Sequence, residues 1–149
     1  MTIKERLYNL CFESINDRLL TIKNTISDIQ NSLQSETKSS AGDKHETGRA
    51  MLQLEREKAG NQLSEIEKQK EILQKINMEL KYQKVALGSV VKTSDLNYFI
   101  AISAGEIKVE STKYYAISVA TPIAQLLLSK CVGDSVQFRE KHFKILEIL

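Results

Sequence analysis

A heptad stripe of aliphatic residues constrains the first third of this chain more than any other feature. Between residues 15 and 33, apolar residues recur at alternating steps of four and three, the spacing of a coiled-coil seam. The stripe comprises Ile15, Leu19, Ile22, Ile26, Ile29 and Leu33, and Ile3, Leu7 and Leu10 or Cys11 extend it backwards. We expect one helix of about 30 residues, roughly 45 Å long. Because a lone helix would leave this seam in water, it needs a partner.

A second stripe of similar length follows the first and supplies that partner. It comprises Leu52, Ala59, Ile66, Leu73 and Leu80 at intervals of seven, with Leu63 and Ile76 between them. The polar run of residues 34–49, which contains Gly42 and Gly48, interrupts both stripes and predicts a chain reversal. We therefore expect an intramolecular antiparallel coiled-coil hairpin in a monomer, not a dimer of two continuous helices. Polar residues on the second seam can specify its register, namely Arg56, Lys70 and Asn77.

The character of the chain changes near Lys81, which predicts two domains, the hairpin in residues 1–80 and a second domain in residues 81–149. Short alternating runs predict strands over residues 88–93, 98–103, 106–110, 114–118, 135–138 and 143–148. Thr121 as an N-cap, with Pro122 at the first helical position, predicts a short helix over residues 123–129. The predicted fold class is α+β, a long hairpin plus a small antiparallel β-rich domain.

Composition narrows the class of protein further. The formal net charge of +2 is too small to predict nucleic-acid binding by itself. No apolar run approaches the roughly 18 residues that span a bilayer, so we expect a cytoplasmic protein with no membrane partner. Cys11 and Cys131 lie in different predicted domains and outside any CxxC pair, and we expect two reduced thiols. His142 alternates with Phe143 in a predicted strand, and we expect a structural role for it.

Two carboxylates, Asp43 and Glu46, lie at or near the tip of the predicted hairpin, which we place at residues 36–49. Residues three apart on a helix share nearly the same face, so the pair could bind one hydrated cation. Mg²⁺ suits such a site, because it takes one or two carboxylates and keeps several waters. The same spacing also forms a capping box, in which each side chain accepts the backbone N–H of the other residue. The two interpretations are compatible.

The neighbours of this pair limit what it can do alone. Glu36, across the turn, is a candidate third acid. Lys38, Lys44 and Arg49 are interspersed with the acids, so a free-standing metal site would be poor and the tip needs a second party. His45 is a possible ligand or base, although a lone exposed histidine is usually neither.

Two stretches of the chain resemble the bacterial Gre family of transcript-cleavage factors. Gly42-Asp43-x-x-Glu46 is similar to the Gly-Asp-x-x-Glu core of the acidic loop in that family. Residues 120–130, Ala-Thr-Pro-Ile-Ala-Gln-Leu-Leu-Leu-Ser-Lys, resemble the family's Ser-Pro-Ile-(Gly/Ala)-x-x-Leu-x-Gly-Lys signature. Gly133-Asp134-x-Val136 then matches its Gly-Asp-x-Val turn. Together with the two predicted domains, the resemblance covers nearly the whole chain.

The resemblance implies a C-terminal FKBP-like domain that binds RNA polymerase and a hairpin that enters the secondary channel of the polymerase. There Asp43 would coordinate a Mg²⁺ shared with the polymerase active site, and Glu46 would be a second ligand or would orient a water. The polymerase would then cut its own backtracked RNA. The protein itself would be no enzyme, would carry no cofactor of its own and would contact nascent RNA only indirectly.

Departures from the family pattern leave other functions open. After the second acid the family continues Asn-Ala-Glu-Tyr, whereas this chain has Thr47-Gly48-Arg49-Ala50, and Ser129 replaces a glycine. One alternative is therefore a regulator that occupies the secondary channel without stimulating cleavage. Another is an interaction scaffold or a prolyl isomerase. Because isomerase sites are usually lined with aromatic residues, and the 4 Phe and 5 Tyr here are spread over both domains, we expect no isomerase activity.

Overall fold

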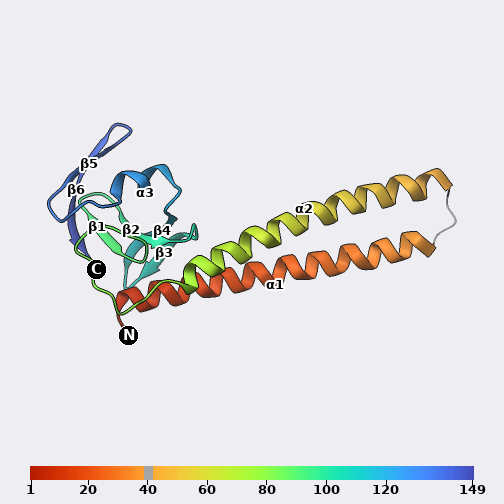
Figure 1. The fold of residues 1–149 in the computed structure, drawn as a ribbon, viewed down its shortest axis with the longest axis horizontal. Helices are drawn as coiled ribbons and strands as arrows, with labels where there is room; N and C mark the ends of the chain where they lie inside the picture. The colour runs from red at the N-terminus through yellow and green to blue at the C-terminus, as the bar shows by residue number, and fades with distance from the viewer. Residues whose placement is uncertain (39–41) are drawn as a thin grey trace. The chain divides into compact units, whose positions relative to one another are not determined.

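The computed structural model describes residues 1–38 and 42–149 and confirms the α+β fold class. Two long helices, α1 (Ile3–Lys38) and α2 (Gly42–Gln74), precede a six-stranded sheet and one short helix (Figure 1). The chain divides into two compact units. We name residues 15–70 the hairpin unit, and residues 1–14 with 71–149 the sheet unit. The domain boundary near Lys81 remains a prediction, as does the FKBP-like character of the second domain.

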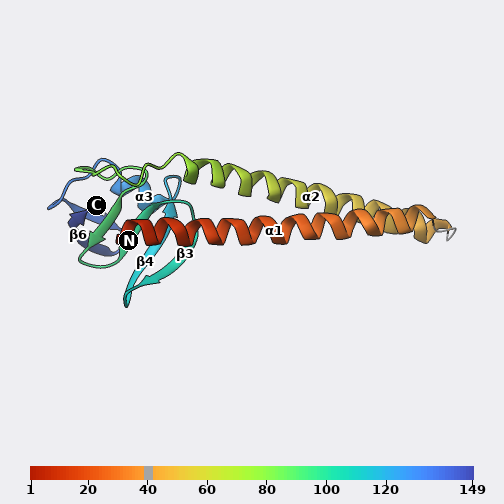
Figure 2. The ribbon, with the colours of Figure 1, turned by 90° about the horizontal axis from the view of Figure 1, so that it is seen from below.

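Within the hairpin unit, α1 and α2 are antiparallel neighbours, as Figures 1 and 2 show. Most of the predicted seam is buried, with at most 8% exposure at Ile15, Leu19, Ile22, Ile26, Ile29, Ala59 and Ile66. Leu33, Leu52 and Leu63 are half-buried. Arg18 Nη1 donates to Gln69 Oε1 across the two helices at 3.1 Å. The heptad spacing therefore predicted both the helices and the faces by which they pack.

The second helix is shorter than its heptad pattern predicts. It ends at Gln74, so Ile76 and Leu80 lie beyond it, and Leu80 is 51% exposed. At the end of α2 the N–H of Ile76 bonds the carbonyl of Leu73 in the tighter i to i+3 pattern. Asn77 Oδ1 then accepts the backbone N–H of Glu79 at 2.9 Å. Such a local side-chain bond competes with the helical ladder and ends the helix before the heptad pattern stops.

All six predicted strands are present, each end within two residues of its predicted position. They are β1 (Val90–Thr93), β2 (Asn97–Ala101), β3 (Gly105–Val109), β4 (Thr112–Ser118), β5 (Ser135–Phe138) and β6 (Lys141–Ile148). Their order in the sheet is β3-β4-β2-β1-β6-β5.

The sheet is mostly antiparallel, as predicted, with one exception: β2 and β4 pair in parallel from Tyr98↔Tyr115 to Ala101↔Ser118. The strands β3 and β4 form a tight hairpin. Its more apolar strand, β4, takes the inner position beside β2, and the largely exposed β3 takes the edge. Because β3 and β4 are antiparallel to each other, whichever of them lies beside β2 fixes the direction of that pairing. Burial favours the more apolar strand, β4, in that position, where it runs parallel to β2.

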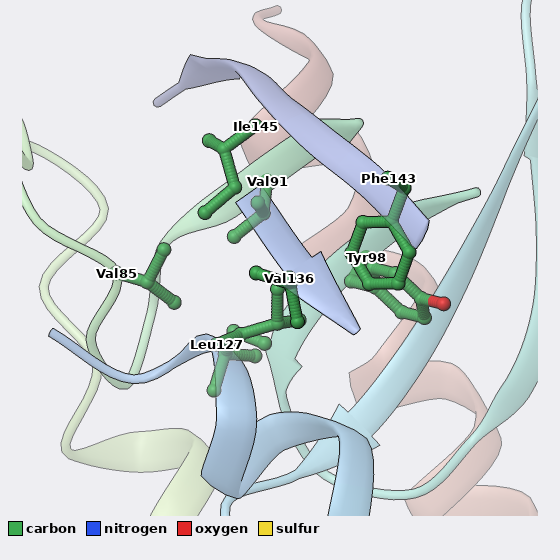
Figure 3. Close-up of a cluster of buried hydrophobic side chains, with 8 residues drawn as sticks. Val85, Val91, Tyr98, Leu127, Val136, Phe143 and Ile145 are labelled. Carbon is green, nitrogen blue, oxygen red and sulfur yellow. The ribbon is translucent and has the colours of Figure 1, made fainter. Parts of the chain in front are cut away.

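The short helix α3 (Pro122–Leu127) begins as predicted, because Thr121 Oγ1 accepts the N–H of Ala124 at 3.3 Å and Pro122 occupies the first turn. Leu127 is fully buried and joins the core of the sheet unit. Figure 3 shows that core, which comprises Val85, Val91, Tyr98, Ile100, Leu127, Val136, Phe143 and Ile145. The helix ends two residues before its predicted end, where Ser129 adopts a left-handed backbone with φ of 69°.

The start of α1 folds with the sheet unit. Lys4 Nζ donates to the carbonyl of Leu80 at 2.8 Å and lies 4.4 Å from the centroid of the Tyr82 ring. Arg6 Nη1 pairs with Glu110 Oε1 at 2.9 Å. Cys11 is fully buried, and burial raises the pKa of its thiol to about 12. No helix in residues 3–38, 42–74 or 122–127 is long and apolar enough to cross a membrane.

The buried Cys11 thiol predicts a loss of stability at alkaline pH. Its pKa in the folded chain is above the ordinary value, so its contribution is fully present below pH 9 and is lost as the pH rises toward 12. At pH 10, one unit above the ordinary thiol pKa of 9.0, the free energy of unfolding should have fallen by about 1.4 kcal/mol, because the unfolded state has released a proton that the folded state keeps. Urea unfolding from pH 8 to 10.5 should show this loss in the wild type and in Cys131→Ala. Equal pH dependence in Cys11→Ala would contradict the assignment.

The left-handed backbone at Ser129 predicts that glycine is preferred there. Ser129→Gly should raise the free energy of unfolding by about 0.5–1 kcal/mol. The relief of left-handed strain, about 1–2 kcal/mol, exceeds the added entropy cost of glycine, about 0.5–1 kcal/mol. Thermal unfolding measures the change. Ser129→Ala, which keeps Cβ, is the matched control, and a gain as large in that variant would show that strain is not the cause.

Candidate functional site

The two predicted acids lie in the first turn of α2, which begins at Gly42. Their spacing of three residues places Asp43 and Glu46 on adjoining positions of one helix face. The Glu46 side chain is exposed. The side chain of Asp43 lies outside the described residues, as do those of Glu36, Lys38, Lys44 and His45. The shared Mg²⁺ and the capping box therefore both stay predictions.

The donor chemistry of the pair suits Mg²⁺ only in part. Two carboxylates on one helical turn match the one or two that this ion takes from a protein, with water or phosphate oxygens filling the remaining positions. No three His, Cys, Asp or Glu side chains gather into a metal-binding group within the part of the chain that the structure describes. The side chain of Asp43 lies outside that part, so a ligand set completed by a partner stays a prediction.

Arg49, one of the residues that departs from the Gre pattern, links the two helices near their ends. Its Nη1 donates to the backbone carbonyl of Leu33 in α1 at 3.2 Å, in a partly buried position. The same guanidinium lies one helical turn after Glu46, on the first part of α2. The basic residue of this segment therefore has a structural role within the hairpin unit.

The second Gre-like stretch is explained largely by folding. Thr121 and Pro122 start α3, and Asp134 Oδ2 accepts the N–H of Cys131 at 2.7 Å in the turn that follows. Gly133 there has φ of +92°, which favours glycine. Of the apolar residues of α3, Leu127 is buried and Ile123 is packed against the core, while Leu126 is 40% exposed.

The structure also brings together aromatic residues that are dispersed in the sequence. Tyr98, Phe138 and Phe143, with Leu96, line a cavity of about 510 Å³ that we name the aromatic pocket. Its remaining lining consists of Asp95, Arg139, Glu140 and Lys141. These residues come from the β1–β2 turn, the start of β2 and the β5–β6 hairpin. Sequence reasoning missed the pocket because nothing local indicates that these two turns are neighbours.

The hydroxyl of Tyr98 has no hydrogen-bond partner among the described residues, although the side chain is only 6% exposed. Its ring centroid lies 6.5 Å from that of Tyr115. Burial, followed by electrostatic interactions with Asp95 and Tyr115, raises the pKa of the Tyr98 phenol. The phenol is therefore a protonated donor at neutral pH, and Tyr98 is one of the residues that line the aromatic pocket.

Comparisons with known proteins found little that is similar to this chain. No protein-family model matches it, and no curated protein matches it. Among solved structures, it is similar to one described as the structure of the transcription factor Gfh1. The two share 22% sequence identity over 92% of each chain, with a TM-score of 0.37. Similarity of this degree does not establish a shared family or function.

The contact of Arg49 predicts that this residue stabilises the ends of the two helices. Arg49→Met keeps the apolar stem and removes the guanidinium that bonds Leu33. Amide hydrogen exchange in the last turns of α1 should accelerate about fivefold, since a hydrogen bond contributes about 1 kcal/mol. Lys23→Met, at an exposed position of α1, should leave exchange unchanged. Equal protection from exchange in the wild type and in Arg49→Met would show that Arg49 does not stabilise the helix ends.

Proposed function

We propose that this chain is a Gre-like transcription elongation factor that acts with RNA polymerase and inserts the tip of its hairpin into the secondary channel. One observation carries the proposal. The Gly-Asp-x-x-Glu motif falls in the first turn of α2, where α1 and α2 meet as an antiparallel hairpin. The shorter helix, α2, has 33 residues and is about 50 Å long. Such a hairpin can carry an acidic turn into a deep cavity of a partner.

In this proposal Asp43 is the metal-coordinating acid, and the exposed Glu46 is a second ligand or accepts the O–H of a water and orients it. A Mg²⁺ in the polymerase active site would supply Lewis-acid stabilisation of the attacking and leaving oxygens in phosphodiester hydrolysis. The chain's own contribution is two carboxylates, which add negative charge where a divalent ion is weakly held. The polymerase remains the nuclease, and contact with nascent RNA is indirect.

A second candidate is a regulator that enters the same channel without stimulating cleavage. The observation that favours it is the bond of Arg49 to the Leu33 carbonyl. Residues 47–50 have lost the acid and the aromatic residue of the Gre pattern, and the arginine gained there is part of the hairpin structure. A cation one turn from Glu46 also lowers the affinity of the pair for a metal ion.

The test is transcript cleavage in stalled, backtracked polymerase complexes. Wild-type protein should release short 3′ RNA fragments. Asp43→Asn should reduce the cleavage rate about 10–100-fold, the loss of metal affinity or activity that is typical when a residue supporting a metal site is mutated. Asp28→Asn makes the same chemical change at an exposed position of α1 and should cleave as the wild type does.

Binding to core polymerase, measured in parallel by pull-down, separates the candidates. Binding without fragment release favours the non-cleaving regulator. Absence of binding eliminates both candidates. Full activity in Asp43→Asn would show that the acid assignment is wrong even if the protein acts on polymerase.

A further inference from the structure

We propose that the aromatic pocket binds an extended peptide segment of a partner protein, with an aliphatic side chain between Phe138 and Leu96 and a main-chain carbonyl accepting from the Tyr98 hydroxyl. The site lies wholly within the sheet unit and does not depend on the acidic turn of α2. It is thus independent of the proposed function.

The walls of the pocket select for an apolar group. Phe138 and Leu96 are partly exposed, whereas Phe143 and Tyr98 are buried beneath them as part of the core. The volume of about 510 Å³ lies within the range of ligand sites, about 300–1,000 Å³. An aliphatic side chain would cover the exposed apolar surface and would require no change in the core.

The polar groups of the pocket select for an amide. Tyr98 is 6% exposed as a residue and lines the pocket, and its hydroxyl has no partner in the described structure, so this donor can bond a ligand there. The carboxylate of Asp95 lines the same pocket, and its ion pair with the exposed Lys141 is long, at 3.7 Å. It therefore keeps acceptor capacity. A donor and an acceptor above an apolar floor complement the carbonyl and N–H of a peptide chain.

Charge and topology favour a peptide over an ionic ligand or another compact molecule. The rim carries two acidic and two basic residues, so it offers no net charge to an anion or a cation. The strand β5, which ends at Phe138, is the last strand of the described sheet. An edge strand presents unpaired backbone groups to an added strand, and pockets beside it then read alternate side chains.

The test uses the full chain, labelled with ¹⁵N, and the probe peptide acetyl-Ala-Ala-Leu-Ala-Ala-amide. Saturable chemical-shift changes are expected at residues 95–98 and 138–143, with a dissociation constant in the millimolar range. Tyr98→Phe removes only the hydroxyl and should weaken binding about fivefold, the effect of one hydrogen bond. Phe138→Ala, a second variant that removes a wall, should weaken it at least as much.

Tyr115→Phe is the matched control, because Tyr115 lies beside Tyr98 on β4 and does not line the pocket. It should bind as the wild type does, and the dispersed spectrum of each variant reports that it is folded. The peptide with glutamate in place of leucine should not saturate. Absence of saturable shifts, equal affinity in Tyr98→Phe, or pocket shifts that depend on protein concentration without peptide would overturn the proposal; the last would identify a second copy of this chain as the occupant.

Discussion

The burial of one aliphatic seam between α1 and α2 is the constraint on which the rest of the hairpin unit depends. Neither helix can shield its stripe alone, and each fully buried isoleucine contributes about 1.5–3 kcal/mol. The antiparallel register that buries Ile22 and Ile66 places the end of α1 beside the start of α2. Arg49 then bonds the Leu33 carbonyl in this same region. The location of the first turn of α2, beside the end of α1, is therefore a consequence of how the seam packs.

The sheet unit has its own constraint where it includes the start of α1 and the end of α2. Leu7, Cys11 and Leu73 are fully buried there, within the unit that contains the sheet. Lys4 supports this arrangement by bonding the Leu80 carbonyl, at the point where the chain has left α2. Side chains at the start of α1 and at the end of α2 thus specify how these helix ends connect to the sheet.

The two candidate sites differ in how they arise. Asp43 and Glu46 are close in sequence, so helical geometry alone brings them to one turn. Tyr98 and Phe138 are 40 positions apart and meet only because β1 pairs with both β2 and β6 in the sheet. The first site needs a partner to complete its chemistry. The second presents the Tyr98 hydroxyl, which has no partner in the described structure, and an apolar floor that is already formed.

The sequence by itself determined the helices, the strands to within two residues, the Thr121 cap and the position of the acidic turn, because these depend on local spacing and backbone preference. It did not determine where α2 ends, since the Asn77 turn competes with a heptad that continues to Leu80. The parallel pairing of β2 with β4 and the aromatic pocket were decided only by the tertiary structure. Strand order and the meeting of distant turns depend on which faces are buried together, and no local pattern carries that information.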